Sequence, residues 1–381
     1  MRLIKPNVEI IEQSDYTLDG IYKMIELAGR TCYKSEDKIT EDSAKEFVNR
    51  MIKSGHGAML EHGTVYLKID RKTCKLEGAN LDFTIGDLMH NPYTKCNIVE
   101  GNSNEVLDYV IYITTNYRVI VENNWTFLLQ YVCEPTEHHE KRITVKWTTD
   151  RGVSHEFVRH RVFSFAMEST RYCNYSKNKF GSELTYIIPS WLDIPEGKYT
   201  NWDNDWCDVS ELKLLHPSVD NLNDATNCFL QSIKNAEYYY FMLLDREWKP
   251  HQARQVLPNA LKTELVMTGF ESDWKGFFAL RSPKYGAKGM HPDAAYLADK
   301  LYDLMYVVKE EVTITHHDEL DGKSNFLKEG DLITFVKEYD KNKCSGNFLK
   351  AIIEPVDGEK YESNKEEYYE RLNKERVQEE R

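Results

Sequence analysis

The segment 156–172 constrains this chain most, because it gathers positive charge in a chain whose formal net charge is -13. Three arginines, one histidine and two serines fall within the thirteen residues 159–171, and aromatic side chains interrupt them. Arginine keeps its charge, and its planar fork binds phosphate through two parallel hydrogen bonds. Serine hydroxyls and the N–H groups of a helix end donate to the same oxygens. The segment therefore predicts a phosphate-binding patch; the alternative is that its arginines pair with carboxylates of the acidic surface.

Charge and composition argue against several broad classes of protein. The excess of 62 Asp and Glu over 49 Lys and Arg disfavours general nucleic-acid binding, because phosphate backbones are held by surplus positive charge. No run approaches the roughly 18 apolar residues that a membrane helix needs, and the first residues lack the apolar segment of a signal peptide. The eight cysteines include no CxxC pair, so neither a zinc framework nor a disulfide scaffold is expected. We expect a cytoplasmic protein with reduced thiols, no metal site, and no nucleic-acid or membrane partner.

Apolar spacing predicts three helices. The first is expected to begin at the cap Thr40 and to stop at Ser54–Gly55, and the second is expected over 225–244. The third begins after Pro292, with an apolar stripe formed by Leu297, Leu301, Leu304, Met305 and Val308. These stripes indicate helices that bury one face against a core.

Strands are expected where apolar and polar residues alternate, at 65–69 and 143–149. Two further β-rich runs, 109–115 and 117–121, flank Asn116 and predict a hairpin, and a short helix is expected at 125–132. The polar chain from about Thr313 ends in a run of charged residues, which is typical of a solvated helix or a frayed tail.

The arginine-rich segment resembles the signature of the flavin-dependent thymidylate synthases, in which RHR is followed by seven positions and a serine. The extended family pattern RHRxxSxNExSxRY is matched at Arg159, His160, Arg161, Ser164, Ser169, Arg171 and Tyr172. Four further stretches agree with family motifs in the same order: 28–35 with ARxCYxS, 55–62 with GHxSxxEH, 253–263 with ARxxLPxxLxT, and 277–281 with FxxLR. The resemblance covers about residues 20–69 and 142–308.

This resemblance implies an α+β fold in which helices pack on an antiparallel-rich sheet. A catalytic domain is expected to comprise residues 1–69 and 142–312, interrupted by an insertion at 70–141 that holds a β-hairpin and a short helix. Residues 313–381 are expected to form a charged C-terminal extension. Members of the family are homotetramers whose active sites combine several subunits, so a homotetramer is expected here too.

The resemblance also implies conversion of dUMP to dTMP, with methylenetetrahydrofolate as carbon donor and NADPH as reductant, through bound FAD. The residues expected to bind FAD are His56, Arg159, His160 and Arg161. The residues expected to bind dUMP are Ser169, Arg171, Arg254 and Arg281. Arg281 is the expected catalytic residue, because a fixed cation at the uracil edge favours the base deprotonated at N3. Arg171 and Arg281 are expected to meet across a subunit interface.

The sequence departs from the family pattern in the same region. The family's Asn-Glu pair is replaced by Ala166–Met167, and the nearest carboxylate, Glu168, comes one residue later, about 100° further around a helix. Glu156 replaces a glutamine usually found three places before RHR, and a carboxylate accepts a hydrogen bond where the amide could donate one. Glu156 and Glu168 are nevertheless included among the expected substrate-binding residues.

These departures leave two other functions open. One is a related flavin- and folate-dependent enzyme that modifies another pyrimidine nucleotide, and the other is a flavin- or nucleotide-binding homologue without catalytic activity. Simpler roles also stay open for single residues. His56 could cap a helix end through its position after Gly55, whereas Arg254 and Arg281 could pair with carboxylates or extend over neighbouring apolar residues.

Overall fold

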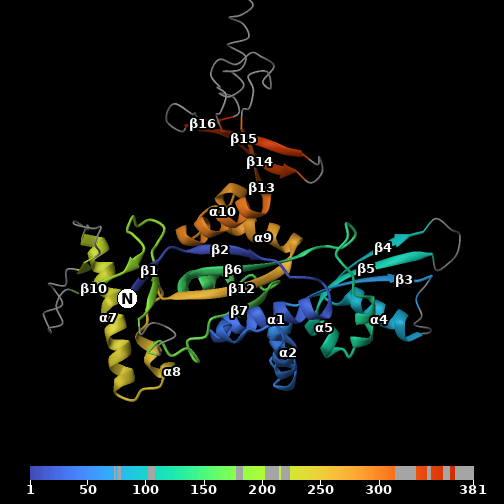
Figure 1. The fold of residues 1–381 in the computed structure, drawn as a ribbon, viewed down its shortest axis with the longest axis horizontal. Coiled ribbons are helices and arrows are strands. Elements are labelled where there is room, and N and C mark those ends of the chain that lie inside the picture. Colours follow the sequence, from blue (N-terminus) through green and yellow to red (C-terminus); the bar gives the residue numbers. More distant parts are fainter. Residues whose placement is uncertain are drawn as a thin grey trace, which may run out of the picture. The chain divides into compact units, whose positions relative to one another are not determined.

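The computed structural model describes residues 1–72, 74, 79–101, 108–176, 183–201, 214–215, 224–313, 332–340, 345–354 and 361–364. The chain divides into two compact units, Met1–Ala298 and Asp299–Arg381. Figure 1 shows the elements of each unit, and α10 (Pro292–Tyr306) contains the boundary between them. The predicted insertion at 70–141 therefore lies within the first unit.

Along the chain, the helices of the first unit connect its strands. They are α1 (Leu18–Tyr33), α2 (Ser43–Lys53), α3 (Gly57–Leu60), α4 (Ala79–His90), α5 (Tyr117–Glu122), α6 (Arg151–Phe157), α7 (Asp224–Asp245), α8 (Pro250–Ala253) and α9 (Glu271–Arg281), with the 3-10 turns η1 (Glu36–Lys38), η2 (Thr126–Tyr131), η5 (Arg254–Val256) and η6 (Pro283–Tyr285). The helix predicted over 225–244 is confirmed by α7, and the short helix predicted at 125–132 is the turn η2. None of the helices that the structure describes has both the length and the apolar character needed to cross a membrane.

A four-stranded sheet forms the centre of the first unit, in the order β2-β6-β12-β7 (Figure 1). Its strands are β2 (Asn7–Ile11), β6 (Arg142–Asp150), β7 (Ser164–Met167) and β12 (Lys262–Phe270). Every neighbouring pair is antiparallel. The expected α+β class with an antiparallel-rich sheet is therefore confirmed, as is the strand predicted at 143–149.

The two faces of this sheet carry different helices. Successive residues of a strand point to opposite faces. On one face, the ring of Trp147 in β6 lies 4.8 Å from the ring of Phe157 in α6 and 5.6 Å from that of Phe277 in α9. On the other face, Val266 of β12 packs with Ala166 of β7 and with residues of α1 and α3. The α6–α9 face and the α1–α3 face are thus separated by the sheet itself.

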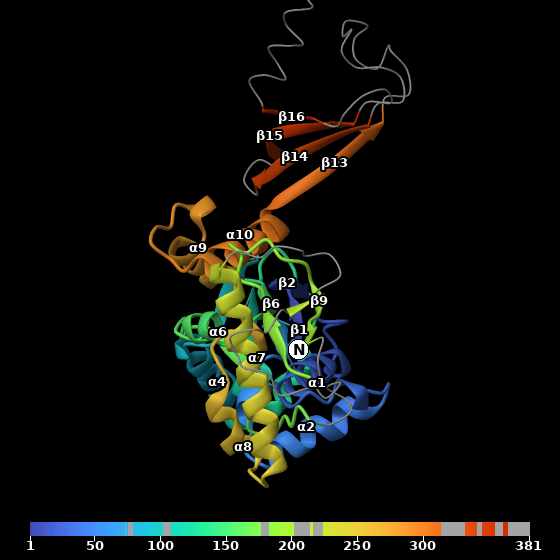
Figure 2. The ribbon, with the colours of Figure 1, turned by 90° about the vertical axis from the view of Figure 1, so that its left-hand side faces the viewer.

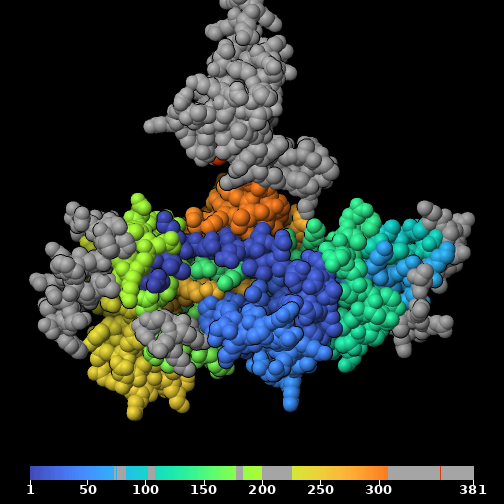
Figure 3. Space-filling view, in the orientation of Figure 1, coloured from blue at the N-terminus to red at the C-terminus, as the bar shows by residue number. Residues whose placement is uncertain are grey.

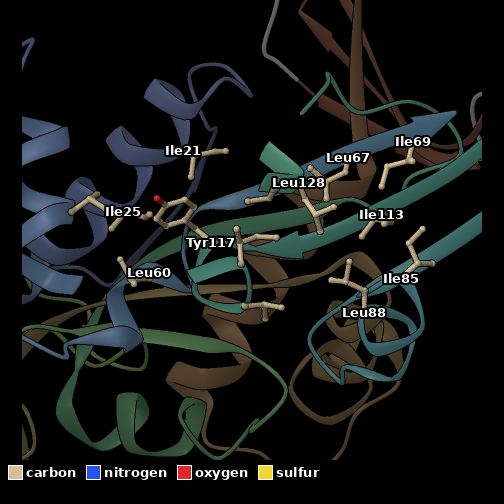
Figure 4. Close-up of a cluster of buried hydrophobic side chains, with 14 of the residues drawn as sticks. Ile21, Ile25, Leu60, Leu67, Ile69, Ile85, Leu88, Ile113, Tyr117 and Leu128 are labelled. Atoms are coloured by element: carbon tan, nitrogen blue, oxygen red, sulfur yellow. The ribbon is translucent and has the colours of Figure 1, made fainter. Parts of the chain in front are cut away.

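The insertion shares a hydrophobic core with the N-terminal helices. Its strands β4 (Lys95–Glu100) and β5 (Tyr109–Asn116) form a sheet with β3 (Thr64–Asp70), in the order β3-β5-β4. One core cluster joins α1, α2 and α3 with β3, β5, α4, α5 and η2. Figure 4 shows Ile21 and Ile25 of α1, Leu60 of α3 and Tyr117 of α5 converging in it. In Figure 3 the teal surface of the insertion lies directly beside the blue surface of these helices.

The predicted hairpin around Asn116 is wrong in its second half, because residues 117–121 form the helix α5. Asn116 has extended backbone angles, and its side chain accepts a hydrogen bond from the Val119 N–H at 3.1 Å, which caps a helix start. Burial of Tyr117 and Ile120 against the shared core outweighs the strand preference of β-branched residues. β5 therefore pairs with β4, which precedes it in the chain, and not with residues 117–121.

The first predicted helix begins later than expected. Helix α2 starts at Ser43, and Thr40 lies before it with its backbone N–H bonded to the Ser43 hydroxyl at 2.9 Å. At the other end Gly55 has a φ of 71°, and the His56 N–H reaches back to the Met51 carbonyl at 2.9 Å. The predicted stop at Ser54–Gly55 is therefore confirmed as a glycine C-cap.

A small third sheet lies beside the long helix α7, as Figures 1 and 2 both show. It has the order β8-β1-β9 and consists of β8 (Thr185–Ile187), β1 (Arg2–Ile4) and β9 (Gly197–Lys198), and a two-stranded pair joins β10 (Thr200–Asn201) with β11 (Leu214–Leu215). The amino group of Met1 is buried there, 3.2 Å from the Glu237 carboxylate of α7.

The second unit contains a four-stranded antiparallel sheet that was not predicted. The charged run from Lys365, for which a solvated helix or a frayed tail is expected, lies outside the described residues. Its strands, in sheet order, are β13 (Val307–Thr313), β14 (Leu332–Asp340), β15 (Ser345–Glu354) and β16 (Tyr361–Asn364). Val308, predicted for the helical stripe, lies in β13. Ile333, Phe335 and Ile353 belong to residue types that favour strands. Residues 314–331 and 365–381 lie outside the described part.

Candidate functional site

The α6–α9 face brings together Glu156, His160 and Arg281. Helix α6 is capped by Asp150, whose carboxylate accepts from the Val153 N–H at 2.9 Å, and it places Glu156 in its last turn. Arg281 is the final residue of α9. Its Nη1 donates to the Glu156 carboxylate, its Nη2 donates to the Glu156 carbonyl at 3.3 Å, and its Nε donates to His160 Nε2 at 3.2 Å. Arg281 therefore forms one hydrogen-bonded group with Glu156 and His160, which precede it by more than a hundred positions.

His160 is a neutral acceptor in this group. Burial lowers the pKa of His160, and the positive charge of Arg281 lowers this pKa further, to about 4. Because Nε2 accepts from Arg281, the proton of the neutral ring is on Nδ1. The ring also lies 5.0 Å from that of Phe277. His160 can therefore donate from Nδ1 to a ligand at neutral pH without carrying a charge.

The turn that carries the RHR residues is pressed onto the sheet. Phe163 packs over Gly269 of β12, where an added Cβ would overlap the Phe163 ring. Its ring also lies 4.6 Å from that of Trp274. Arg159 and Arg161 remain exposed on this turn, and neither forms an ion pair with any residue that the structure describes. The alternative that the arginines of this segment pair with surface carboxylates therefore does not hold for these two within the described chain. For Arg281, the separate alternative of pairing agrees with its ion pair to Glu156.

The α1–α3 face holds a second group of predicted residues. His56 precedes α3, and its Nδ1 lies 3.2 Å from the Tyr33 hydroxyl. The Tyr33 ring meets that of Tyr172 edge-on at 5.7 Å, and the Arg171 guanidinium lies 5.6 Å from the centre of the Tyr172 ring. The backbone of His56 acts in the helix cap, as its simpler role suggested, while its imidazole is exposed and turned toward Tyr33.

Glu168 lies on the same side but faces inward. Both oxygens of its buried carboxylate are bonded within the chain, Oε1 by the Tyr175 hydroxyl at 3.0 Å and Oε2 by Lys262 Nζ at 2.9 Å. The segment before it is the strand β7, not a helix, so a shift of one residue turns a side chain to the opposite face rather than by 100°. The next residue, Ser169, is held by its N–H at 3.0 Å from the Cys32 carbonyl.

An ionic network fixes this segment to the sheet. Glu264 of β12 lies 2.6 Å from Lys262 Nζ, 2.6 Å from Lys34 Nζ and 3.2 Å from Lys146 Nζ. Burial alone would raise the pKa of Glu264, but Lys262 and Lys34 outweigh burial and lower the pKa to about 2. Through Lys262 the network continues to Glu168. Lysine and glutamate at alternate positions of a strand gave only a weak signal in the sequence, and the network was not predicted.

Arg254 belongs with the second group. It lies in η5, and its Nη1 donates to the Thr170 hydroxyl at 3.0 Å, next to Ser169 and Arg171. The structure therefore collects Ser169, Arg171 and Arg254 in one place. Arg281 lies with the RHR turn on the other side of the sheet. Among the described residues, no three or more His, Cys, Asp or Glu side chains are grouped to hold a metal ion.

Comparison with known proteins bears on this arrangement. The family model described as thymidylate synthase complementing protein matches residues 111–308, just over half of the 381 residues. The chain belongs to this family. Curated relatives include the flavin-dependent thymidylate synthases of Mycobacterium avium, 28% identical over 35% of this chain and 47% of that protein, and Corynebacterium aurimucosum, 27% identical over 43% of this chain and 59% of that protein. The chain spans about half the length of the curated relatives it matches.

Among solved structures, a UMP/dUMP methylase PolB from Streptomyces cacaoi, bound with 5-Br UMP, is similar at 14% identity with a TM-score of 0.35, covering 80% of this chain and 91% of that one. The family match includes the RHR turn, Ser169, Arg171, Arg254 and Arg281, but begins after His56. Three side chains that contact predicted residues had no predicted role: Tyr33, Lys262 and Tyr175. Tyr33 and Lys262 are 23 and 94 positions from the residues they contact, so the fold brings these pairs together.

Proposed function

We propose that this chain is a flavin-dependent thymidylate synthase that converts dUMP to dTMP, with methylenetetrahydrofolate as carbon donor and NADPH as reductant, through bound FAD. The observation that carries the proposal is the RHR turn: two exposed guanidinium groups without a described carboxylate partner stand beside a neutral histidine that bonds Arg281. In an acidic protein, unneutralised arginines on a packed turn suit a phosphate-bearing ligand. We propose FAD and dUMP as these ligands, as the family resemblance implies.

The residues present fit the binding of FAD. Arg159 and Arg161 would hold its phosphate oxygens, and His160 would donate from Nδ1 as a neutral hydrogen-bond donor. His56, exposed and oriented by Tyr33, would contact the same cofactor. When bound, FAD supplies the hydride transfer of the reaction, and the side chains supply position and charge.

A second set of residues fits a nucleotide monophosphate. Ser169, Arg171 and Arg254 lie together and would hold the dUMP phosphate, and the ionic network behind Glu168 keeps their segment in place. Arg281 would place its positive charge at the uracil edge and favour the base deprotonated at N3. Glu168 would act on the substrate through this segment, because its own oxygens are already bonded.

Each set includes residues from both faces of the central sheet: His56 lies apart from the RHR turn, and Arg281 lies apart from Ser169, Arg171 and Arg254. This supports the proposal of a homotetramer with active sites between subunits, because the α6–α9 face of one copy would meet the α1–α3 face of another around each ligand. A cytoplasmic location, with dUMP and folate as small-molecule partners, belongs to the same proposal.

One observation favours a second candidate function. The Glu156 carboxylate bonds Arg281 where the family pattern has a glutamine, so the charge of Arg281 is partly neutralised at the position proposed for the uracil edge. A different pyrimidine nucleotide, or a different one-carbon product, would suit a site with this carboxylate. An E156Q variant restores the family residue and separates the two candidates.

The test begins with the absorption spectrum of the purified protein. We expect a flavin spectrum, NADPH oxidation stimulated by dUMP, and a product with the mass of dTMP when methylenetetrahydrofolate is present. A protein that takes up no FAD would refute the proposal. A product of another mass, shifted to dTMP by E156Q, would support the second candidate, and flavin binding without NADPH oxidation would indicate an inactive homologue.

A further inference from the structure

We infer that Arg118, in the insertion, is a positioning residue for flavin binding, an inference that rests on the proposed function. Arg118 lies in α5, outside every motif that the family resemblance covers. It reaches across to α3, the single helical turn that directly follows His56. The insertion therefore acts on the candidate flavin contact without touching the flavin itself.

The first step is an ion pair at the end of α3. Arg118 Nη1 lies 2.6 Å from Glu61 Oε1, and Arg118 Nε lies 2.7 Å from Glu122 Oε1. Glu61 is the C-cap residue that directly follows α3, and His56 is the residue that directly precedes this helix. A helix of four residues has little stability of its own, so its position depends on contacts of this kind.

The second step is a contact at the start of α3. A Cβ added to Gly57 would lie 3.0 Å from Arg118 Nε and 3.1 Å from Glu122 Oε1. The Arg118–Glu122 pair thus lies against the backbone of the residue that follows His56. Arg118 contacts both ends of the turn, and a side chain larger than hydrogen at position 57 would displace it.

Other contacts hold the insertion in place without Arg118. The Tyr117 N–H donates to the Gly63 carbonyl at 2.9 Å, and the Tyr117 hydroxyl lies 2.9 Å from that of Tyr22 in α1. Leu60 and Tyr117 share the core drawn in Figure 4. Because the Arg118 ion pairs are partly exposed, their loss should leave the fold intact.

Arg118 is better suited to position α3 than to bind a phosphate. Two carboxylates already neutralise its guanidinium, in contrast to Arg159 and Arg161, which have none among the described residues. Its effect on the cofactor would pass through α3 to the His56 imidazole.

The experiment compares FAD dissociation constants of R118A, R118K and G57A with wild type, by flavin fluorescence, together with the thermal midpoint of the apoprotein and the dissociation constant for dUMP. We expect R118A to weaken FAD binding on the order of tenfold, because a small displacement of a ligand contact is costly. R118K should recover part of the loss, G57A should resemble R118A, and dUMP affinity and the midpoint should stay near wild type.

K23A, which removes the exposed pair of Lys23 with Asp19 at 2.6 Å in α1, is the matched control and should bind FAD normally.

A double variant sharpens the test. If Arg118 acts through Glu61, adding E61A to R118A should cause no further loss of FAD affinity. Unchanged FAD binding in R118A would overturn the inference while leaving the proposed function intact. If R118A lowers the thermal midpoint and weakens binding of both dUMP and FAD, Arg118 has a general structural role instead of a positioning role. A wild-type protein that binds no FAD would refute the proposed function, and the inference with it.

Discussion

The two faces of the central sheet hold their functional residues by different physical means. On the α6–α9 face, His160, which binds Arg281, packs on the ring of Phe277, and Phe277 packs on Trp147. On the α1–α3 face, Glu168 and Glu264 are held by lysines in a largely buried ionic network. Packing of rings is insensitive to pH and salt, whereas a network of buried charges depends on every partner being present and ionised.

The difference teaches which changes each face should tolerate. The aromatic face leaves two charged groups available to a ligand, because Arg159 and Arg161, unlike Arg281, have no described carboxylate partner. The ionic face uses its charges internally, so that its ligand-binding residues, Ser169 and Arg171, depend on a scaffold behind them. Substitutions on the first face should change chemistry, and substitutions on the second should change stability.

The largest expected effect is on the aromatic face. R281A should lower the rate of dTMP formation on the order of 10²–10³-fold, because a cation aimed at developing negative charge in a dry site contributes that much. The measurement is kcat with dUMP, accompanied by FAD content and the unfolding midpoint. R281K keeps the positive charge but loses the planar guanidinium, so its rate should lie between those of wild type and R281A. An undiminished rate in R281A would remove Arg281 from the catalytic role.

The next effect belongs to the ionic face. K262A should lower the free energy of unfolding by about 3 kcal/mol, because it leaves the buried Glu168 carboxylate without its cation. Urea denaturation measures the change. The double variant E168Q/K262M removes both charges and should recover most of the loss. If K262A is as stable as wild type, the network is not what holds this face.

The third prediction concerns Arg159 on the aromatic face, where removal of a charge should change FAD affinity but not the stability of the fold. R159A should weaken FAD binding by about 10- to 100-fold, because a charge-assisted contact to phosphate is lost. Its free energy of unfolding should change by less than about 0.5 kcal/mol, since Arg159 is exposed. Fluorescence titration and denaturation together give both values. A destabilised R159A with normal FAD affinity would reverse the expected contrast between the faces.

The smallest effect distinguishes the faces by pH. The pKa of His160 falls from 6.5 to about 4 on folding, so its contribution is present above pH 6.5 and is lost as the pH falls toward 4. The pKa of Glu264 falls from 4.5 to about 2, so its contribution is present above pH 4.5 and is lost as the pH falls toward 2.

Denaturation of wild type, H160N and E264Q across these windows measures both contributions as differences. Each difference should change by on the order of 1 kcal/mol over its own window. Burial and the charge of Arg142 lower the pKa of His62 to about 3. Because His62 titrates in wild type and in both variants alike, its contribution cancels when each variant's free energy of unfolding is subtracted from that of wild type. Two windows that coincide would contradict the assignment of one titrating group to each face.

Local pattern predicted much of the fold where one signal dominated. The strand at 143–149 and the helix at 225–244 were found because their apolar residues recur with a single period. Residues 117–121 have strand-forming side chains, yet they form a helix because Asn116 caps it and the shared core buries Tyr117. The strands β14 and β15 were not predicted, although residues 332–336 and 348–353 are rich in strand-forming types, because the interpretation of this segment rested on its charged end.

The sequence alone determined the chemistry of the side chains. It contains arginines that stay charged, and their spacing matches the pattern of the flavin-dependent thymidylate synthases. Only the tertiary structure decided the partners of those side chains. Arg281 meets Glu156 across 125 positions, and Lys262 meets Glu168 across 94. The physical reason is that a hydrogen bond or an ion pair depends on a separation of a few ångströms, which is set by how distant segments pack on the two faces of one sheet.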